Sequence, residues 1–191
     1  MTNDINDLLN ALEQLAIKDD IPIVDKATAK FLAKIVSEKQ PKNILEIGTA
    51  IGYSGIIMLL ASPKANLITI ERSLNRVIIA TDTFTKSGVT DRVKIINADV
   101  FEFLESNTQK FDFIFLDGAK NQYPKLLSHL KSILTKSGTL VTDNVQSLKH
   151  SNFSPQILLK IKEFRALLKQ DPDLHTEFLN IGDGISVSIK K

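Results

Sequence analysis

The sequence predicts a doubly wound α/β domain whose mostly parallel sheet ends in an antiparallel hairpin. From Asn43 onward, runs that are apolar at nearly every position alternate with amphipathic helical stretches. Such runs are typical of parallel strands that helices cover on both faces of a sheet. The expected strands are Ile44 to Ile47, Leu67 to Ile70, Val93 to Ile96, Phe113 to Leu116 and Thr139 to Thr142.

The end of the chain predicts the hairpin. Gly182-Asp183-Gly184 is a turn signal between two further strand patterns, His175 to Ile181 and Ile185 to Lys190, which would complete a seven-stranded sheet. Two amphipathic helices are expected in residues 2–40, where they would pack on the sheet, cover a site or form a dimer contact. We expect residues 1–191 to form a single domain, with a helical preface over 1–40 and a core over 41–191.

Composition excludes several classes of protein. Cysteine is absent, which excludes disulfides, thiolate metal sites and cysteine nucleophiles. No apolar run approaches the ~20 residues that a membrane span needs, and the segment Met1 to Asp7 is polar and acidic. We therefore expect a soluble, cytoplasmic protein with no membrane partner. The 24 basic and 22 acidic residues give a net charge of +2, which would aid nucleic-acid binding without requiring it.

The first strand pattern leads into a candidate nucleoside site. Glu46-Ile47-Gly48 closes the strand, and Gly52 precedes a helix predicted over Tyr53 to Ala61. The glycines either permit close approach of a ligand to the backbone or only shape a tight turn. Glu71 ends the next apolar run, where its carboxylate can accept both hydroxyls of a ribose. Because a dinucleotide site needs Gly-x-Gly-x-x-Gly, the spacing Gly-x-x-x-Gly disfavours a pyrophosphate.

Two later strands end in oxygen ligands. Asp117 and the pair Asp143-Asn144 each follow a predicted central strand, so they should converge at the carboxyl edge of the sheet. These donors suit Mg²⁺ or another hard divalent cation and suit Zn²⁺ poorly. The alternative is that Asp143 and Asn144 form a turn or a helix cap. Of the histidines, His150 follows Asn144 closely enough for its side chain to reach a substrate bound at this edge of the sheet. The Gly-x-Ser-x-Gly and phosphate-loop motifs are absent, which excludes hydrolase and nucleoside-triphosphatase roles of those types.

Together these segments resemble the metal-dependent O-methyltransferases of the catechol and caffeoyl-coenzyme A type. Glu46-x-Gly48-x-x-x-Gly52 is similar to the first motif of the class I S-adenosylmethionine-dependent enzymes. Asp117-Gly118-Ala119-Lys120-Asn121-Gln122-Tyr123 and Asp143-Asn144-Val145 resemble their Asp-x-x-Lys-x-x-Tyr and Asp-Asn-Val motifs. The likeness covers nearly the whole chain from about Pro22. It implies the Rossmann-like class I methyltransferase fold.

The resemblance also implies residue roles. The S-adenosylmethionine residues would be Glu46, Gly48, Gly52, Tyr53, Ser54, Glu71, Ala98, Asp99 and Asp117. A Mg²⁺ ion or another hard divalent cation would be held by Asp117, Asp143 and Asn144, and Lys120 and Asp117 would be the catalytic residues. The metal would lower the pKa of an acceptor hydroxyl, Lys120 would take its proton, and the methyl group would move in a single displacement with inversion. A homodimer is a further expectation from the family.

The acceptor expected from the resemblance is tRNA. Within the family the chain looks closest to the bacterial tRNA 5-hydroxyuridine methyltransferases, which make 5-methoxyuridine in the anticodon loop. The adjacent 4-oxo and 5-hydroxy oxygens of this base could chelate a metal as a catechol does. A small-molecule catechol-type enzyme is the alternative, because Gln146 to His150 departs from the apolar, glycine-ending segment expected after Asp-Asn-Val. A non-catalytic S-adenosylmethionine-binding or RNA-binding protein is a third reading, since fold alone does not give function.

Overall fold

The sheet has the predicted doubly wound form. The structure is a computed structural model that describes residues 2–146 and 153–191. The described residues form one seven-stranded sheet in the order β3-β2-β1-β4-β5-β7-β6. The strands are β1 (Asn43–Ile47), β2 (Asn66–Ile70), β3 (Val93–Ile96), β4 (Phe111–Leu116), β5 (Leu134–Thr142), β6 (Leu174–Leu179) and β7 (Ile185–Lys190). Neighbours among β1 to β5 are parallel, whereas β7 is antiparallel to both β5 and β6, which confirms the predicted fold class.

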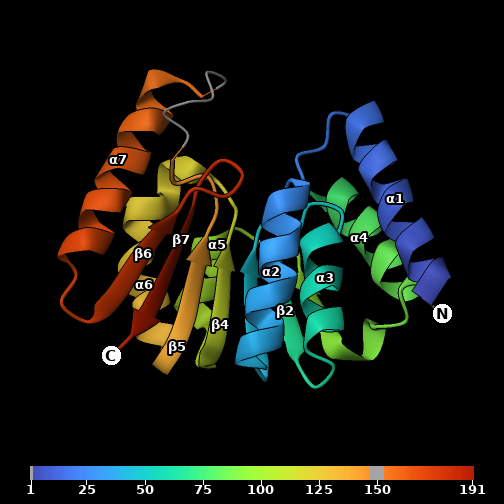
Figure 1. Cartoon of the computed structure of the whole chain (residues 1–191), viewed down its shortest axis with the longest axis horizontal. Helices are drawn as coiled ribbons and strands as arrows, with labels where there is room; N and C mark the ends of the chain where they lie inside the picture. Colours follow the sequence, from blue (N-terminus) through green and yellow to red (C-terminus); the bar gives the residue numbers. More distant parts are fainter. Residues whose placement is uncertain (1, 147–152) are drawn as a thin grey trace.

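Helices cover both faces of this sheet (Figure 1). They are α1 (Thr2–Lys18), α2 (Lys26–Lys39), α3 (Tyr53–Ala61), α4 (Leu74–Lys86), α5 (Val100–Ser106), α6 (Tyr123–Ile133) and α7 (Pro155–Gln170), with 3-10 turns η1 (Thr90–Arg92) and η2 (Lys120–Gln122). Helices α1 to α4 contribute to one buried cluster, and α5 to α7 contribute to the other. Among the described residues, no helix combines the length and apolar character required to cross a bilayer.

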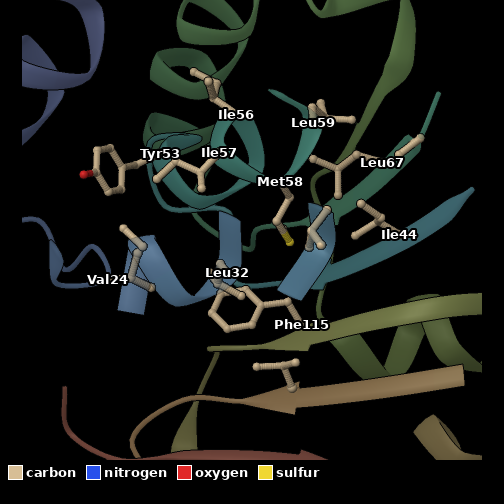
Figure 2. Close-up of a cluster of buried hydrophobic side chains, with 14 of the residues drawn as sticks. Val24, Leu32, Ile44, Tyr53, Ile56, Ile57, Met58, Leu59, Leu67 and Phe115 are labelled. Carbon is tan, nitrogen blue, oxygen red and sulfur yellow. The ribbon is translucent and has the colours of Figure 1, made fainter. Parts of the chain in front are cut away.

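The central strands are buried on both faces. Phe113 and Phe115 of β4 belong to the cluster under α1 to α4, whereas Ile114 and Leu116 belong to the opposite cluster. Successive side chains of a strand point to opposite faces, so an unbroken apolar run fills both clusters. Figure 2 shows part of the first cluster, where Phe115 lies near Leu32 of α2. The strand order reverses at β1, between β2 and β4, and the carboxyl edge there is the usual ligand position in such sheets.

Strand β5 is longer than the sequence pattern predicts. It begins at Leu134 rather than Thr139, and its register with β4 jumps from the pair Phe111–Leu134 to the pair Phe113–Thr139. The intervening residues bulge, and Ser137 has a φ of 61°. Their polar, glycine-containing sequence hides the start of the strand from a search for apolar runs. Of the segment Gln146 to His150, which departs from the pattern expected after Asp-Asn-Val, only Gln146 is among the described residues, so the candidate His150 lies outside them.

The helical preface packs on the sheet and also reaches the site. Leu12 of α1 and Leu32 of α2 are buried in the first cluster, as the apolar stripes predict. Asp25 caps α2, because its Oδ1 accepts hydrogen bonds from the backbone N–H groups of Ala27 and Thr28 at 2.7 and 2.8 Å. The connection between the helices then passes the carboxyl edge of the sheet, where residues 22–24 line a cavity.

Candidate active site

A cavity of about 250 Å³ lies at the carboxyl ends of β1 to β4. The predicted site residues in its wall are Gly48, Tyr53, Ser54, Glu71, Ala98, Asp99, Asp117 and Lys120. These residues are far apart in sequence, and the parallel strands bring them to one edge because each strand ends there. Glu46 and Gly52 lie outside this wall, and Asp143 and Asn144 follow the neighbouring strand β5.

Gly48 permits two strand ends to meet. Its φ is 103°, and a Cβ at this position would lie 2.5 Å from the carbonyl oxygen of Asp117. Gly52 has a φ of 88° and is the N-cap residue before α3, with the ring of Phe84 3.2 Å from where its Cβ would be. Both positions therefore require glycine for the shape of the turn. Gly48 also faces the cavity, whereas the cofactor contact of Gly52 stays a prediction.

Glu46 supports the loop from beneath. Its side chain is fully buried and accepts hydrogen bonds from the hydroxyls of Ser54 and Thr69, both at 2.6 Å. Burial raises the pKa of the Glu46 carboxyl to about 7, although both hydroxyl donors lower it. Ser54 lies at the start of α3 and Thr69 lies on β2, so the Glu46 carboxyl group links β1 to α3 and to β2. In this structure Glu46 acts on the wall through Ser54, and its predicted cofactor contact is untested.

Glu71 is held in place by hydrogen bonds to neighbouring loops. Its carboxylate accepts hydrogen bonds from the backbone N–H groups of Ala50 at 3.1 Å and Ser73 at 2.9 Å. Its own carbonyl oxygen accepts a hydrogen bond from Nδ2 of Asn97 at 2.8 Å. These bonds fix an acidic side chain in the cavity wall, where it could accept hydroxyl donors as predicted for a ribose.

The far wall comes from the segment after β3. Asp99 caps α5 by accepting a hydrogen bond from the N–H of Phe101 at 2.9 Å, so its side chain also has a structural role. Arg72 and Arg76 follow Glu71 in the sequence and also line the cavity. Neither residue was predicted from the sequence. Isolated arginines after a strand give no signal that separates a cavity wall from a solvated surface.

Tyr53 connects the wall to the preface. Its hydroxyl donates to Glu13 of α1 at 2.7 Å, and Glu13 also pairs with Lys26 of α2 at 2.9 Å. The hydrogen bond from Tyr53, followed by that from Lys26, lowers the pKa of Glu13, while burial raises the pKa of Tyr53. Figure 2 shows the Tyr53 ring at the margin of the cluster, with its oxygen directed outward. Glu13 was missed because it lies within an ordinary amphipathic helix.

Asp117 and Lys120 form an ion pair in the cavity wall. Lys120 Nζ lies 3.1 Å from Asp117 Oδ1, and both side chains are less than one-fifth exposed, at 17% and 19%. Burial raises the pKa of Asp117, and the ammonium group of Lys120 opposes that rise. Lys120 begins the short turn η2 and lines the cavity, so it does not lie on an exposed helix face.

Asp143 and Asn144 form a turn beside Asp117. Strands β4 and β5 pair Leu116 with Thr142, so Asp117 and Asp143 occupy neighbouring strand ends. Burial, followed by the negative charge of Asp117, raises the pKa of Asp143 to about 7. Asp143 Oδ1 accepts a hydrogen bond from the N–H of Asn144 at 2.8 Å, and a turn follows at Val145 and Gln146.

These residues fit a hard divalent cation. The negative charge of Asp117 disfavours the ionised form of Asp143. A cation between the two carboxylates would reduce this repulsion. Asn144 adds a neutral oxygen donor of the kind that Mg²⁺ accepts. Within residues 2–146 and 153–191, no group of three or more His, Cys, Asp and Glu side chains is arranged as a metal site. The candidate site therefore depends on two carboxylates and an amide.

Comparisons with known proteins agree with this architecture. A protein-family model described as O-methyltransferase matches residues 2–191. The catechol O-methyltransferase of Niastella koreensis is 31% identical over 176 residues, which are 85% of this chain and 79% of that protein.

Solved structures extend the likeness to the fold. A Staphylococcus aureus protein, provisionally named a caffeoyl-CoA O-methyltransferase, is 32% identical, with a TM-score of 0.87 over 96% of this chain and 92% of its own. An O-methyltransferase of Bacillus cereus, solved in complex with SAH, shares the fold at 24% identity and a TM-score of 0.85, over 97% of this chain and 91% of its own. The chain therefore belongs to the O-methyltransferase family, the class I S-adenosylmethionine-dependent enzymes that its motifs resemble.

Proposed function

We propose that this enzyme methylates a hydroxyl oxygen that has a second oxygen beside it, using S-adenosylmethionine and a divalent cation. The observation that carries the proposal is the position of Asp117. It lines the cavity at the ends of β1 to β4, pairs with Lys120 at 3.1 Å and neighbours Asp143 at the next strand end. A methyl donor in the cavity and an acceptor at the two carboxylates would thus meet at one residue.

The roles of the chain's own residues follow from charge. Glu71 would accept the ribose hydroxyls of the donor, and Gly48 would admit its methionine part to the wall. The methyl carbon of a sulfonium is already electrophilic, so the acceptor must become an oxyanion and lie in line with the carbon–sulfur bond. Lys120, in its neutral form, would take the acceptor proton as the new oxygen–carbon bond forms and the carbon–sulfur bond breaks. The products are the methyl ether, S-adenosylhomocysteine and a proton.

The divalent cation would be bound by Asp117, Asp143 and Asn144. When bound, such an ion lowers the pKa of a coordinated hydroxyl and orients the acceptor. Mg²⁺ matches the oxygen donors of these side chains. The buried carboxyl groups support this assignment, because burial and the charge of Asp117 disfavour ionisation of Asp143, and a cation between the two groups would favour their charged forms.

The acceptor that we propose first is 5-hydroxyuridine in the anticodon loop of a tRNA. Its 4-oxo and 5-hydroxy oxygens are adjacent, and an unpaired loop can present the base to a pocket. The net charge of +2 is compatible with a phosphate-bearing partner. Lys120 and Gln122, from the Asp117 to Tyr123 motif, both line the cavity.

A small catechol-like acceptor is the second candidate. The specific observation in its favour is the 31% identity to a catechol O-methyltransferase over most of both chains. A catechol presents the same pair of adjacent oxygens without any phosphate, so the two candidates differ in the surface that they need outside the pocket.

The deciding experiment incubates the protein with labelled S-adenosylmethionine and either tRNA carrying 5-hydroxyuridine or catechol. Each reaction is run with Mg²⁺ and with EDTA, and mass spectrometry identifies the product. Mg²⁺-dependent 5-methoxyuridine would support the tRNA acceptor, whereas methylated catechol with unchanged tRNA would support the second candidate. Transfer insensitive to EDTA would contradict the metal site, and cofactor binding without transfer to either acceptor would favour a non-catalytic protein.

Matched variants sharpen this experiment. Asp143→Ala should abolish Mg²⁺-dependent transfer because the site loses a carboxylate ligand. Asp82→Ala removes an exposed carboxylate of α4 that pairs with Lys86, and it should leave transfer unchanged. Equal activity of the two variants would contradict the role of Asp143.

A further inference from the structure

The turn that carries Asn144 is supported by the hairpin turn between β6 and β7. The N–H of Val145 donates to the carbonyl oxygen of Gly184 at 2.9 Å, and the N–H of Gln146 donates to that of Asp183 at 3.0 Å. Nδ2 of Asn144 donates to Oδ2 of Asp183 at 3.3 Å. The backbone N–H groups that follow Asn144 are therefore fixed from one side.

A side chain from α7 fixes the same turn from another side. Arg165 Nη1 donates to the carbonyl oxygen of Val145 at 2.8 Å. The guanidinium carbon lies 4.4 Å from the centre of the Phe178 ring on β6, so the group is stacked as well as hydrogen bonded. Among these contacts to Val145 and Gln146, that of Arg165 comes from a side chain and can be removed by substitution while the hairpin bonds remain.

The turn needs such support because of its backbone. Asn144 has a φ of 58°, in the left-handed region that is strained for a residue with a Cβ. Val145 is fully buried and anchors the turn in the cluster under α5 to α7. The Val145 carbonyl and the Gln146 N–H belong to one peptide plane, directly after the residue that follows Asn144. Arg165 holds the carbonyl of that plane and the Asp183 carbonyl holds its N–H, so the path of the chain after Asn144 is fixed from both sides.

We infer that Arg165 is a positioning residue for the divalent cation, acting through the Val145 carbonyl on Asn144. The inference rests on the proposed function, since it assumes the ion that Asp117, Asp143 and Asn144 would bind. A metal ion would take the amide oxygen of Asn144, whose nitrogen donates to Asp183. A planar guanidinium can stack on Phe178 and reach the carbonyl together, which a lysine ammonium does less well.

The structure separates this role from cofactor binding. Neither Arg165 nor Val145 belongs to the wall of the cavity at β1 to β4. Loss of Arg165 should thus weaken the binding of the cation and leave the affinity for the nucleoside cofactor unchanged. General destabilisation of the fold would weaken both.

The test measures Mn²⁺ binding to the full chain without acceptor, by electron paramagnetic resonance, and S-adenosylhomocysteine binding in EDTA, by calorimetry. Arg165→Met should raise the Mn²⁺ dissociation constant roughly tenfold, in the range found for groups that orient metal ligands. Its S-adenosylhomocysteine affinity should stay within twofold of wild type. Lys169→Met is the matched control, because Lys169 lies on the same helix with its Nζ 5.6 Å from the same Phe178 ring.

Arg165→Lys gives a second, gentler test, and it carries the experiment if Arg165→Met does not fold. Arg165→Lys should raise the Mn²⁺ dissociation constant several-fold, while Lys169→Met should leave it unchanged. Mn²⁺ binding by both Arg165 variants equal to wild type would overturn the inference and leave the proposed function intact. Equal weakening by Lys169→Met would also overturn it. Absence of Mn²⁺ binding to the wild-type chain would contradict the proposed metal site itself, and the inference with it.

Discussion

The buried carboxyl group of Glu46 should make stability depend on pH. Its folded-state pKa is raised to about 7 from an ordinary value of 4.5. The folded state therefore holds the extra proton between these values, and this contribution to the free energy of unfolding falls as pH rises through that window, by about 3 kcal/mol at most. Glu46→Gln lacks the titration. Urea unfolding of both proteins at pH 5 and pH 8 should show a larger fall for wild type.

Glu38→Gln is the control for this measurement, because Glu38 is exposed on α2 with a weak 3.9 Å contact to Lys34. It should follow the wild-type pH profile. Parallel profiles for wild type and Glu46→Gln would contradict a raised pKa at Glu46.

Lys120 should affect turnover much more than cofactor binding. If it accepts the acceptor proton, Lys120→Met should lower kcat by roughly 10²- to 10⁴-fold, the usual contribution of a general base. The cofactor dissociation constant should change by only a few-fold, because Glu71 and the loop at Gly48 remain. Steady-state kinetics and calorimetry measure the two effects. Lys125→Met, an exposed change on α6, should match wild type, and comparable loss there would argue against a specific role for Lys120.

At the scale of elements, Glu13 and Tyr53 join α1 to α3 beside the cavity. The hydrogen bond of 2.7 Å should contribute about 1 kcal/mol to the free energy of unfolding. A double-mutant cycle of Glu13→Met and Tyr53→Phe, each of which removes one partner of the bond, should therefore give a coupling energy of that size in urea unfolding. Each single variant should also weaken the binding of S-adenosylhomocysteine a few-fold. Glu13 holds Tyr53, and Tyr53 and residues 22–24 form part of the cavity wall. Additive single effects would show that the two side chains do not interact in solution.

The opposite end of α3 is fixed by Arg92. Its Nη1 donates to the carbonyl oxygens of Leu59, Ser62 and Ala65 at 3.2, 3.2 and 3.1 Å. Leu59 lies in the last turn of α3, and Ser62 and Ala65 follow the helix, where a cation suits the helix dipole. Arg92→Ala should lower the free energy of unfolding by about 2 kcal/mol, as for hydrogen bonds to charged groups. Lys94→Ala, an exposed change nearby in sequence, should be near neutral in the same assay, and a similar loss there would contradict the prediction.

At the scale of the whole molecule, charge distinguishes the proposed acceptors. A tRNA acceptor brings phosphates, so its dissociation constant should rise tenfold or more between about 50 and 200 mM salt. Catechol carries no phosphate and should show a nearly constant KM over the same range. Filter binding and steady-state kinetics measure these quantities. A salt-independent affinity for tRNA would contradict recognition through its backbone, even if the chain keeps its net charge of +2.

The candidate site was predictable where its chemistry lies at strand ends. Asp117 and Glu71 each close an apolar run, and parallel strands carry such residues to a common edge. Glu13, Arg76 and Arg165 gave no comparable signal, because their patterns are those of ordinary helices. Their contacts join α1 to α3, line the start of α4 beside the cavity, and link α7 to the turn after β5.

The sequence by itself determined the succession of strands and helices along the chain, the closing hairpin and the class of reaction. Apolar periodicity and turn residues are local properties, so they can be read without coordinates. Tertiary structure alone decided how long β5 is, where the preface crosses the site, and that Glu46 lies beneath the cavity wall. Those features depend on register and on packing between residues distant in the chain. Local patterns carry little information about either, because many partners would satisfy the same apolar face.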